Sequence, residues 1–222
     1  IINTYFCKKI DMIYNSFKYI FPPRPKNSMN PTELKFIENQ GLIAQCKMNG
    51  SNGTLYISPD KIIVMNRHGQ ILTGFNIPID EVKKLYRGNG GWMVLNFEYM
   101  NKSKKDENNE TFNHKITIFD ILVFDSNYMI GSTFENRIKL LDDLYGKVEC
   151  NKHYLYEISE NVFRVKSYTE DFENKFNELI KIDMCEGLVF KRANGKLEMG
   201  LRPENTSKSQ FKIRKPTKNY KF

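Results

Sequence analysis

The most constraining feature of the sequence is a long series of short strand-like runs that begins after Gly41. Each run is apolar or alternates apolar and polar residues, and turn-forming residues follow it, which is the pattern of β-strands joined by turns. The predicted strands are residues 42–48, 54–58, 62–66, 92–100, 115–124, 187–191, 196–200 and 210–214. This pattern predicts an α+β domain of antiparallel sheets with a few flanking helices.

The first predicted helix lies at the start of the chain. Residues 1–21 carry apolar residues close to helical spacing, so we expect an amphipathic N-terminal helical segment that packs on a main domain formed by residues 22–222. A short helix is expected after Pro31, where proline favours the first turn, and it would stop at Gly41.

Three further helices are predicted between and after the strands. Residues 78–86 form one, with Asp80 as its expected cap. The run Ser132-Thr133-Phe134-Glu135 is a capping box that would open a helix ending at Gly146, and residues 169–182 form the last helix. The polar stretch at 101–114 is expected to be a mobile surface loop.

The charge and the cysteines of the chain indicate which partners and which cellular setting to expect. The net charge of +8 favours a polyanion, and much of the excess follows Glu204, where Lys208, Lys215 and Lys218 are candidate contacts to nucleic acid. A basic end of this kind is just as often simply solvated. No apolar run approaches a membrane span, so no membrane partner is expected. Scattered cysteines without a CxxC pair indicate neither a zinc site nor a disulfide framework, and favour a cytoplasmic setting.

Lys47 lies at the end of the first predicted strand, just before the glycine-rich turn 50–53. This placement leaves its amine at a strand end, where a lysine can serve as a covalent nucleophile. Taken alone, a lysine beside a turn is far more often a solvated side chain. Whether Lys47 is a nucleophile therefore depends on the motifs in the rest of the chain.

Six short motifs follow one another along the chain. They are Lys47-Met48-Asn49-Gly50, Arg67-His68-Gly69, Phe97-Glu98-Tyr99-Met100, Phe119-Asp120-Ile121-Leu122-Val123-Phe124-Asp125, Glu186-Gly187-Leu188-Val189-Phe190-Lys191 and Lys212-Ile213-Arg214. In this order and spacing, they resemble the covalent nucleotidyltransferase superfamily of ATP-dependent DNA ligases, RNA ligases and mRNA capping guanylyltransferases. The resemblance covers roughly residues 22–222 and extends to small phage- or viral-type ligases. It implies an ATP-grasp-like adenylation domain.

The resemblance also implies the chemistry of the site. Lys47 would attack the α-phosphate of ATP and form a phosphoramidate. A free lysine is protonated at neutral pH, so the nucleophile needs cationic neighbours or desolvation to present its lone pair. By resemblance, Lys191, Lys212 and a divalent metal, Mg²⁺ or Mn²⁺, supply that positive field and bind the phosphates.

The remaining motif residues would hold the nucleotide and the metal. The implied nucleotide-binding residues are Gln45, Arg67, Glu98, Phe119, Lys191, Lys212 and Arg214. Phe119 would lie flat against the purine, and Glu98 and Glu186 would hold the metal. Without the other motifs, Phe119 would be assigned to the core and the two glutamates to an exposed strand and a turn.

The chain departs from the family pattern at three places. Asn49 stands where most DNA ligases have aspartate, and Arg214 stands where lysine is usual; arginine keeps the charge but not the point-like ammonium. The sequence ends shortly after the last motif, so no C-terminal oligonucleotide-binding fold is expected within it.

We therefore expect a monomeric ATP-dependent polynucleotide ligase that joins 5′-phosphate and 3′-hydroxyl ends through a lysyl-AMP intermediate. Asn49 and the missing oligonucleotide-binding fold place RNA narrowly ahead of nicked DNA as the substrate. The same motifs leave open an mRNA capping guanylyltransferase and a non-catalytic nucleic-acid-binding relative.

Overall fold

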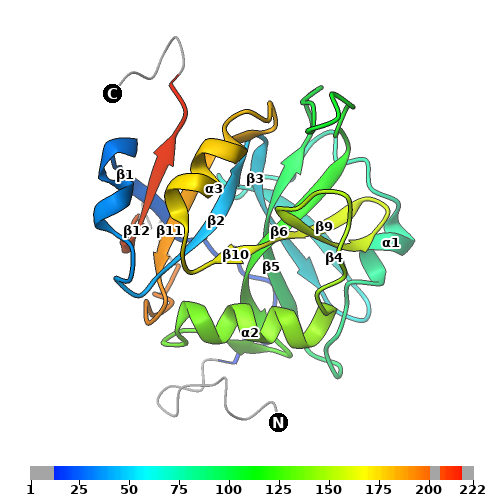
Figure 1. Ribbon diagram of the computed structural model, residues 1–222. Helices are drawn as coiled ribbons and strands as arrows, with labels where there is room; N and C mark the ends of the chain where they lie inside the picture. Colours follow the sequence, from blue (N-terminus) through cyan, green and yellow to red (C-terminus); the bar gives the residue numbers. More distant parts are fainter. Residues whose placement is uncertain (1–12, 201–205, 217–222) are drawn as a thin grey trace.

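The computed structural model describes residues 13–200 and 206–216, and these form two sheets (Figure 1). The five-stranded sheet has the order β1 (Arg24–Ser28), β12 (Thr206–Arg214), β11 (Cys185–Arg192), β2 (Leu42–Met48), β10 (Ser167–Tyr168). The larger sheet has the order β4 (Ile62–Asn66), β3 (Ser51–Ile57), β5 (Met93–Met100), β6 (Lys115–Phe124), β9 (Val162–Val165), β8 (Leu155–Ser159), and β7 (Asn127–Tyr128) pairs with β6.

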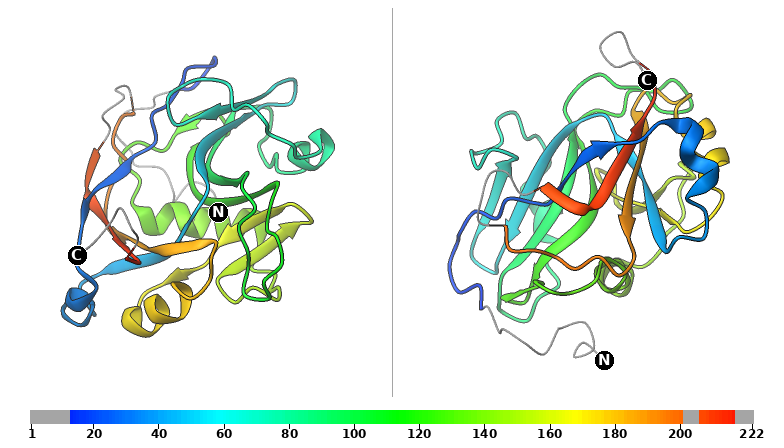
Figure 2. Two further views of the ribbon diagram at one scale, coloured as in Figure 1. Left: turned by 90° about the horizontal axis from the view of Figure 1, so that it is seen from above. Right: turned by 90° about the vertical axis from the view of Figure 1, so that its left-hand side faces the viewer.

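Most strand pairs are antiparallel, and the predicted α+β class is confirmed. Two pairs are parallel instead. β1 runs parallel to β12 along one edge, where the two strands lie side by side in the right-hand view of Figure 2, and β6 runs parallel to β9. Parallel pairs join segments far apart in the chain, so no local pattern in the sequence indicates them.

The chain crosses from one sheet to the other immediately after Lys47. Strand β2 ends at Met48 in the smaller sheet, and β3 begins at Ser51 in the larger one. Gly50 makes this crossing possible, because a Cβ on it would lie 2.5 Å from the backbone oxygen of Tyr99. The crossing places the end of β2 directly beside β5 of the other sheet.

The buried apolar side chains form two clusters, one within the larger sheet and one that joins the smaller sheet to β8 and β9 of the larger. The larger sheet is covered by α2 (Phe134–Tyr145), whose Leu140 and Leu141 are buried, and by the short α1 (Ile79–Lys83). The smaller sheet packs against α3 (Phe172–Leu179) and a 3₁₀ helix (Pro31–Phe36) (Figure 1). Burial of these amphipathic faces stabilises helices that are too short to persist alone.

The ends of the helices differ from the sequence prediction in detail. The cap of α2 is Thr133 rather than Ser132, since the Thr133 hydroxyl accepts a hydrogen bond from the backbone N–H of Asn136 at 3.3 Å. The predicted stop at Gly146 is confirmed. Pro78, not Asp80, precedes α1, and Asp80 lies in its first turn.

The predicted N-terminal helix is wrong over the part that the structure describes. Residues 1–12 lie outside the described residues, and residues 13–21 run as irregular chain. Tyr14 and Ile20 are buried against the larger sheet, and the backbone N–H of Ile20 donates to the Tyr56 hydroxyl at 2.8 Å. The apolar residues of this segment have nearly helical spacing because an irregular segment contacts the same core at intervals.

Two other segments also differ from expectation. Residues 196–200 form only an isolated bridge between Lys196 and Thr133 rather than a strand. The predicted surface loop 101–114 has no helix or named strand, but it is anchored by buried Phe112 and by an ion pair of 2.8 Å between Asp106 and Lys152. Within residues 13–200 and 206–216, no helix has the length and apolar character needed to cross a membrane.

Candidate nucleotide site

A cavity of about 590 Å³ opens where the two sheets meet. Nine residues selected from the sequence line it: Gln45, Lys47, Arg67, Glu98, Phe119, Glu186, Lys191, Lys212 and Arg214. They come from β2, β5, β6, β11, β12 and the turn after β4. Residues spread over most of the chain thus converge on one cavity, as the resemblance implied, while their chemical roles stay predictions.

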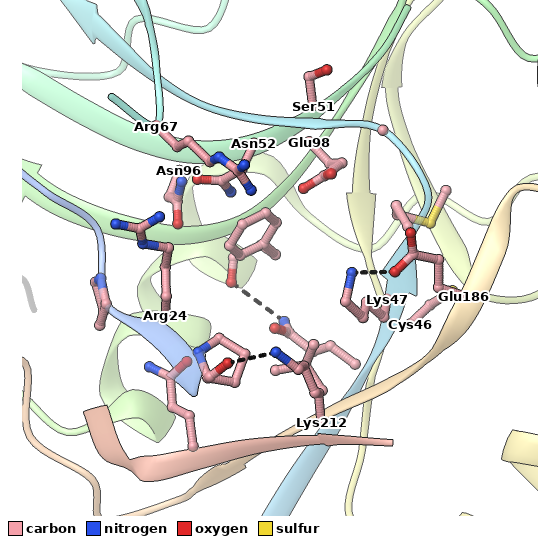
Figure 3. A pocket seen from close by; sticks show the side chains of 18 of the residues that line it. Arg24, Cys46, Lys47, Ser51, Asn52, Arg67, Asn96, Glu98, Glu186 and Lys212 are labelled. Atoms are coloured by element: carbon pink, nitrogen blue, oxygen red, sulfur yellow. Dashed lines mark hydrogen bonds and ion pairs between the residues drawn. The ribbon is translucent and has the colours of Figure 1, made fainter. Parts of the chain in front are cut away.

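Lys47 lies in an ionic cluster at one end of this cavity (Figure 3). Its Nζ is 2.5 Å from Glu186 Oε2, and the Nε of Arg214 is 3.6 Å from the same oxygen. With its amide oriented to suit both neighbours, Asn49 donates to Glu186 Oε1 at 3.0 Å and accepts from Lys104 Nζ at 3.2 Å. Glu186 is therefore the centre of the cluster.

Strand register explains why Glu186 meets both cations. Gly187 pairs with Lys47 on one side and with Arg214 on the other, so β11 places Glu186 between β2 and β12. The register shifts between Cys185 and Gly187, and Gly187 has a φ of +145°. This bulge directs the Glu186 side chain into the cavity.

Glu98 faces the same end of the cavity from β5, and Figure 3 shows its carboxyl group near Lys47. Burial raises the pKa of Glu98 to about 7; Lys47 opposes this shift, and the neighbouring Glu186 adds to it. Two neighbouring carboxyl groups that line one cavity suit a hard cation such as Mg²⁺, which takes one or two protein carboxylates and completes its shell with phosphates and water. Among residues 13–200 and 206–216, no cluster of three or more His, Cys, Asp or Glu could hold a metal.

Phe119 and Lys191 form another part of the cavity wall. The Lys191 ammonium lies 5.1 Å from the centre of the Phe119 ring and 3.7 Å from Asp120 Oδ2. Burial lowers the pKa of Lys191 to about 8. Gln45 supports this wall, since its Nε2 donates to the Phe119 carbonyl at 3.4 Å.

Lys212 links the cavity to the edge strand β1. Its Nζ donates to the carbonyl of Pro25 at 3.1 Å. Burial, and then the nearby charges of Arg214 and Lys47, lower the pKa of Lys212. Of the groups expected to supply positive charge around Lys47, Lys212 thus lies close enough to interact with it, and Arg214, which was not among them, adds a second cation.

Arg67 lies at a more open part of the wall. It is exposed, and its Nε donates to the His68 ring at 3.1 Å. At this position, Arg67 can contact a bound nucleotide only through the exposed end of its side chain.

Two of the predicted nucleic-acid contacts, Lys208 and Lys215, do not line the cavity. Lys208 is exposed on β12. Lys215 donates to the carbonyls of Ile180 at 3.4 Å and Ile182 at 3.0 Å, so its ammonium holds the chain just after α3. Lys218 lies outside the described residues. Contact of these lysines with nucleic acid stays a prediction.

Sequence reasoning missed several residues of the cavity wall: Arg24, Asn52, Asn96 and Gln210. Arg24 is the most informative, because it brings a further cation from the edge strand β1 (Figure 3). Nothing in the sequence around Arg24 indicated pairing with residues 206–214. Cys46 and Cys185 are buried free cysteines, and their sulfur atoms lie 3.1 Å apart.

The comparisons with known proteins agree with this geometry. Residues 26–210 match the family described as ATP dependent DNA ligase domain. Among solved structures, mycobacterial DNA ligase D complexed with ATP and MES has a TM-score of 0.63 and 15% identity, covering 89% of this chain and 62% of that chain. The ligase domain of M. tuberculosis LigD has a TM-score of 0.61 and 16% identity, and the match covers 89% of this chain and 61% of that chain. A structure from work on Lig E DNA ligases has a TM-score of 0.56 and 12% identity, and the match covers 89% of this chain and 70% of that chain.

A search among curated proteins gives no match. At these identities, the structural likenesses show the fold, and the chain spans 62% and 61% of the first two ligase structures. The family match covers far more than half of the sequence and includes the first five of the six motifs, with the proposed nucleophile among them. The chain therefore belongs to the ATP-dependent DNA ligase domain family of covalent nucleotidyltransferases.

Proposed function

We propose that this chain is the adenylylating part of an ATP-dependent polynucleotide ligase and that Lys47 carries the AMP. The observation that supports this most directly is the position of the Lys47 amine, at a strand end inside a cavity that also holds Glu98, Glu186 and Lys212. Covalent transfer of a nucleotide needs the amine, a cation and carboxylates together.

The reaction proceeds in three displacements. The Lys47 ammonium gives a proton to solvent, and the neutral amine attacks the α-phosphorus of ATP; a P–N bond forms, the P–O bond to the β-phosphate breaks, and pyrophosphate leaves. A 5′-phosphate oxygen of the nucleic acid then attacks the same phosphorus, breaking the P–N bond and releasing the lysine. Finally, a 3′-hydroxyl oxygen attacks the 5′-phosphorus: a P–O bond forms between the two ends, the P–O bond to AMP breaks, AMP leaves, and the hydroxyl proton goes to solvent.

The side chains of the cavity divide this work by their chemistry. Lys191, Lys212 and Arg214 supply positive charge for the phosphate oxygens. Phe119 offers a ring face to the base. Glu98 and Glu186 would hold Mg²⁺ or Mn²⁺, which neutralises developing charge on the phosphates.

The family match now supports nicked DNA ahead of RNA as the substrate, which reverses the narrow preference drawn from the sequence. RNA is the second candidate because Asn49 is the residue found in some RNA ligases at this position. Sealing assays on matched nicked DNA and nicked RNA would separate the two.

The test of the proposed function is the intact mass of the protein after incubation with ATP and Mg²⁺. We expect a gain of one AMP that is absent from Lys47→Ala and present in Lys61→Ala, where an exposed lysine outside the cavity is removed. Labelling by GTP instead would indicate capping. Absence of an adduct with either nucleotide would contradict the proposal.

A further inference from the structure

Arg137 is a buried cation that none of the sequence motifs contains. It lies on α2, with 2% of its side chain exposed. Its Nε donates to Asp120 Oδ1 at 2.7 Å, its Nη2 to Asp120 Oδ2 at 3.1 Å, and its Nη1 to the Ser132 carbonyl at 2.7 Å. The guanidinium is therefore fixed by a bidentate contact and by the backbone that leads into the helix.

Asp120 has a second cationic partner, which belongs to the cavity. Lys191 Nζ lies 3.7 Å from Asp120 Oδ2, a longer contact than either of those made by Arg137. The same ammonium lies 4.1 Å from the centre of the Phe134 ring and 5.1 Å from that of Phe119. Lys191 thus faces two aromatic rings and only one oxygen of a carboxylate.

Two cations share one carboxylate in this group, so one positive charge is not balanced within it. Because the short contacts of Asp120 are with Arg137, the weaker partner is Lys191, which lines the cavity. Burial of the ammonium, reinforced by the Arg137 charge, lowers the pKa of Lys191, while Asp120 opposes that shift. An anion in the cavity would offset the cost of burying the unbalanced charge.

We propose that Arg137 is a positioning residue for nucleotide binding: by holding both oxygens of Asp120, it keeps the Lys191 ammonium beside Phe119 and available to a phosphate. Without Arg137, the carboxylate of Asp120 would have only Lys191 as a charged partner among these residues. The carboxylate would then move closer to the Lys191 ammonium and neutralise its charge. The inference rests on the proposed function, because it assumes that the anion bound in the cavity is a nucleotide phosphate.

A purely structural role for Arg137 predicts a different result, and the chain offers a matched control. Arg164 is also 2% exposed, pairs with Asp142 and donates to the Gly146 carbonyl at 2.7 Å. It touches the other end of α2 and does not line the cavity. Arg164→Lys should therefore lower stability as Arg137→Lys does, without an effect on the nucleotide.

The experiment measures calorimetric binding of the α,β-methylene analogue of ATP, which cannot release pyrophosphate, to the wild-type protein and to folded variants. We expect Arg137→Lys to weaken binding about tenfold and Arg137→Met about 100-fold, because a displaced cation loses its contact to the phosphate. Arg164→Lys should change binding less than about twofold at a similar loss of melting temperature.

Unchanged affinity in folded Arg137→Lys and Arg137→Met would overturn the inference, as would no binding by the wild-type protein. If neither Arg137 variant folds, binding of the analogue to Phe134→Leu is the deciding measurement. It keeps all three charges and removes the ring against Lys191, so binding should weaken about fivefold; unchanged binding would overturn the inference. Binding of the analogue without formation of lysyl-AMP from ATP would instead contradict the proposed function alone.

Discussion

Lys47 and Glu186, from the neighbouring strands β2 and β11, form an ion pair with 2.5 Å between Nζ and Oε2. The pair places the proposed nucleophile against a carboxylate that we assign to metal binding. The Lys47 amine cannot attack a phosphorus atom while it is directed at this oxygen. Binding of a cation by Glu186 would therefore also free the amine, which couples metal binding to attack.

Glu186→Gln should lower the rate of lysyl-AMP formation about 100-fold, because a neutral amide holds a divalent cation poorly even though it releases Lys47. Rates should be measured over a range of Mg²⁺ concentrations, and high Mg²⁺ should not restore the wild-type rate. Asp183→Asn is the control, since Asp183 pairs with Lys104 at 3.3 Å and does not line the cavity. A Glu186→Gln protein that reacts faster than wild type would show that Glu186 only restrains the lysine.

Arg24→Ala should raise the KM for ATP about tenfold, the usual cost of one hydrogen bond to a charged group. Arg24 lines the cavity from β1, whereas Lys26, two residues further along the same strand, is exposed outside it. Lys26→Ala removes an equal charge and should leave KM unchanged. Equal effects of the two substitutions would mean that only the general positive charge of this edge matters.

The candidate site could be predicted from the sequence because most of its residues occur in short motifs. Lys47, Glu98 and Glu186 each lie in a strand whose apolar pattern and turn residues are local. Arg24 could not be found in this way. Its place depends on the parallel pairing of β1 with β12, about as far apart in sequence as this chain allows, and only the folded structure supplies that contact.

In the fold as well, some elements follow from the local sequence and others from contacts between distant segments. The bounds of β2, β4 and β6 agree with the sequence prediction, since each is a compact apolar run. The error over residues 13–21 arose because Ile13, Phe17 and Ile20 have helical spacing, although the contacts of Phe17 and Ile20 with the larger sheet determine the conformation of this segment.

Gly187→Ala should destabilise the fold by about 3 kcal/mol, the upper range for a strained backbone. Gly187 has a φ of +145°, and a Cβ there would lie 2.1 Å from the Ile213 carbonyl oxygen on the neighbouring strand. Gly74 also has a positive φ, of +72°, but no atom lies within 4 Å of its Cβ position. Gly74→Ala should therefore cost only about 1 kcal/mol, the left-handed penalty alone.

Urea denaturation of both glycine variants measures the difference. Because Gly187 directly follows Glu186, the same substitution should also slow lysyl-AMP formation in whatever fraction stays folded. Equal losses of stability at the two glycines would contradict the close packing of β11 against β12.

The stability of the protein should fall as pH rises from about 5 to 8, in part because of Glu98. Burial raises the pKa of Glu98 from 4.5 to about 7, so the folded state binds this proton more tightly than the unfolded state does. The favourable contribution of protonated Glu98 is complete below 4.5 and is lost as pH rises through about 7. Glu98→Gln removes the titration, and it should therefore be more stable than wild type at pH 8, by about 1–3 kcal/mol, and similar to it near pH 4.5.

Glu81 provides a control of opposite sign. Burial opposes the shift, but hydrogen bonds from Ser159 and Asn161 lower the pKa of Glu81, so its contribution is present above the ordinary value and is lost in acid. Glu81→Gln should therefore destabilise the protein at pH 8, where Glu98→Gln stabilises it. Melting temperatures of the three proteins at pH 5 and pH 8 measure both effects. Mg²⁺ should raise the wild-type melting temperature more at pH 8 than at pH 5, because the cation competes with the proton on Glu98; equal shifts at the two pH values would contradict the assignment of Glu98 to the metal.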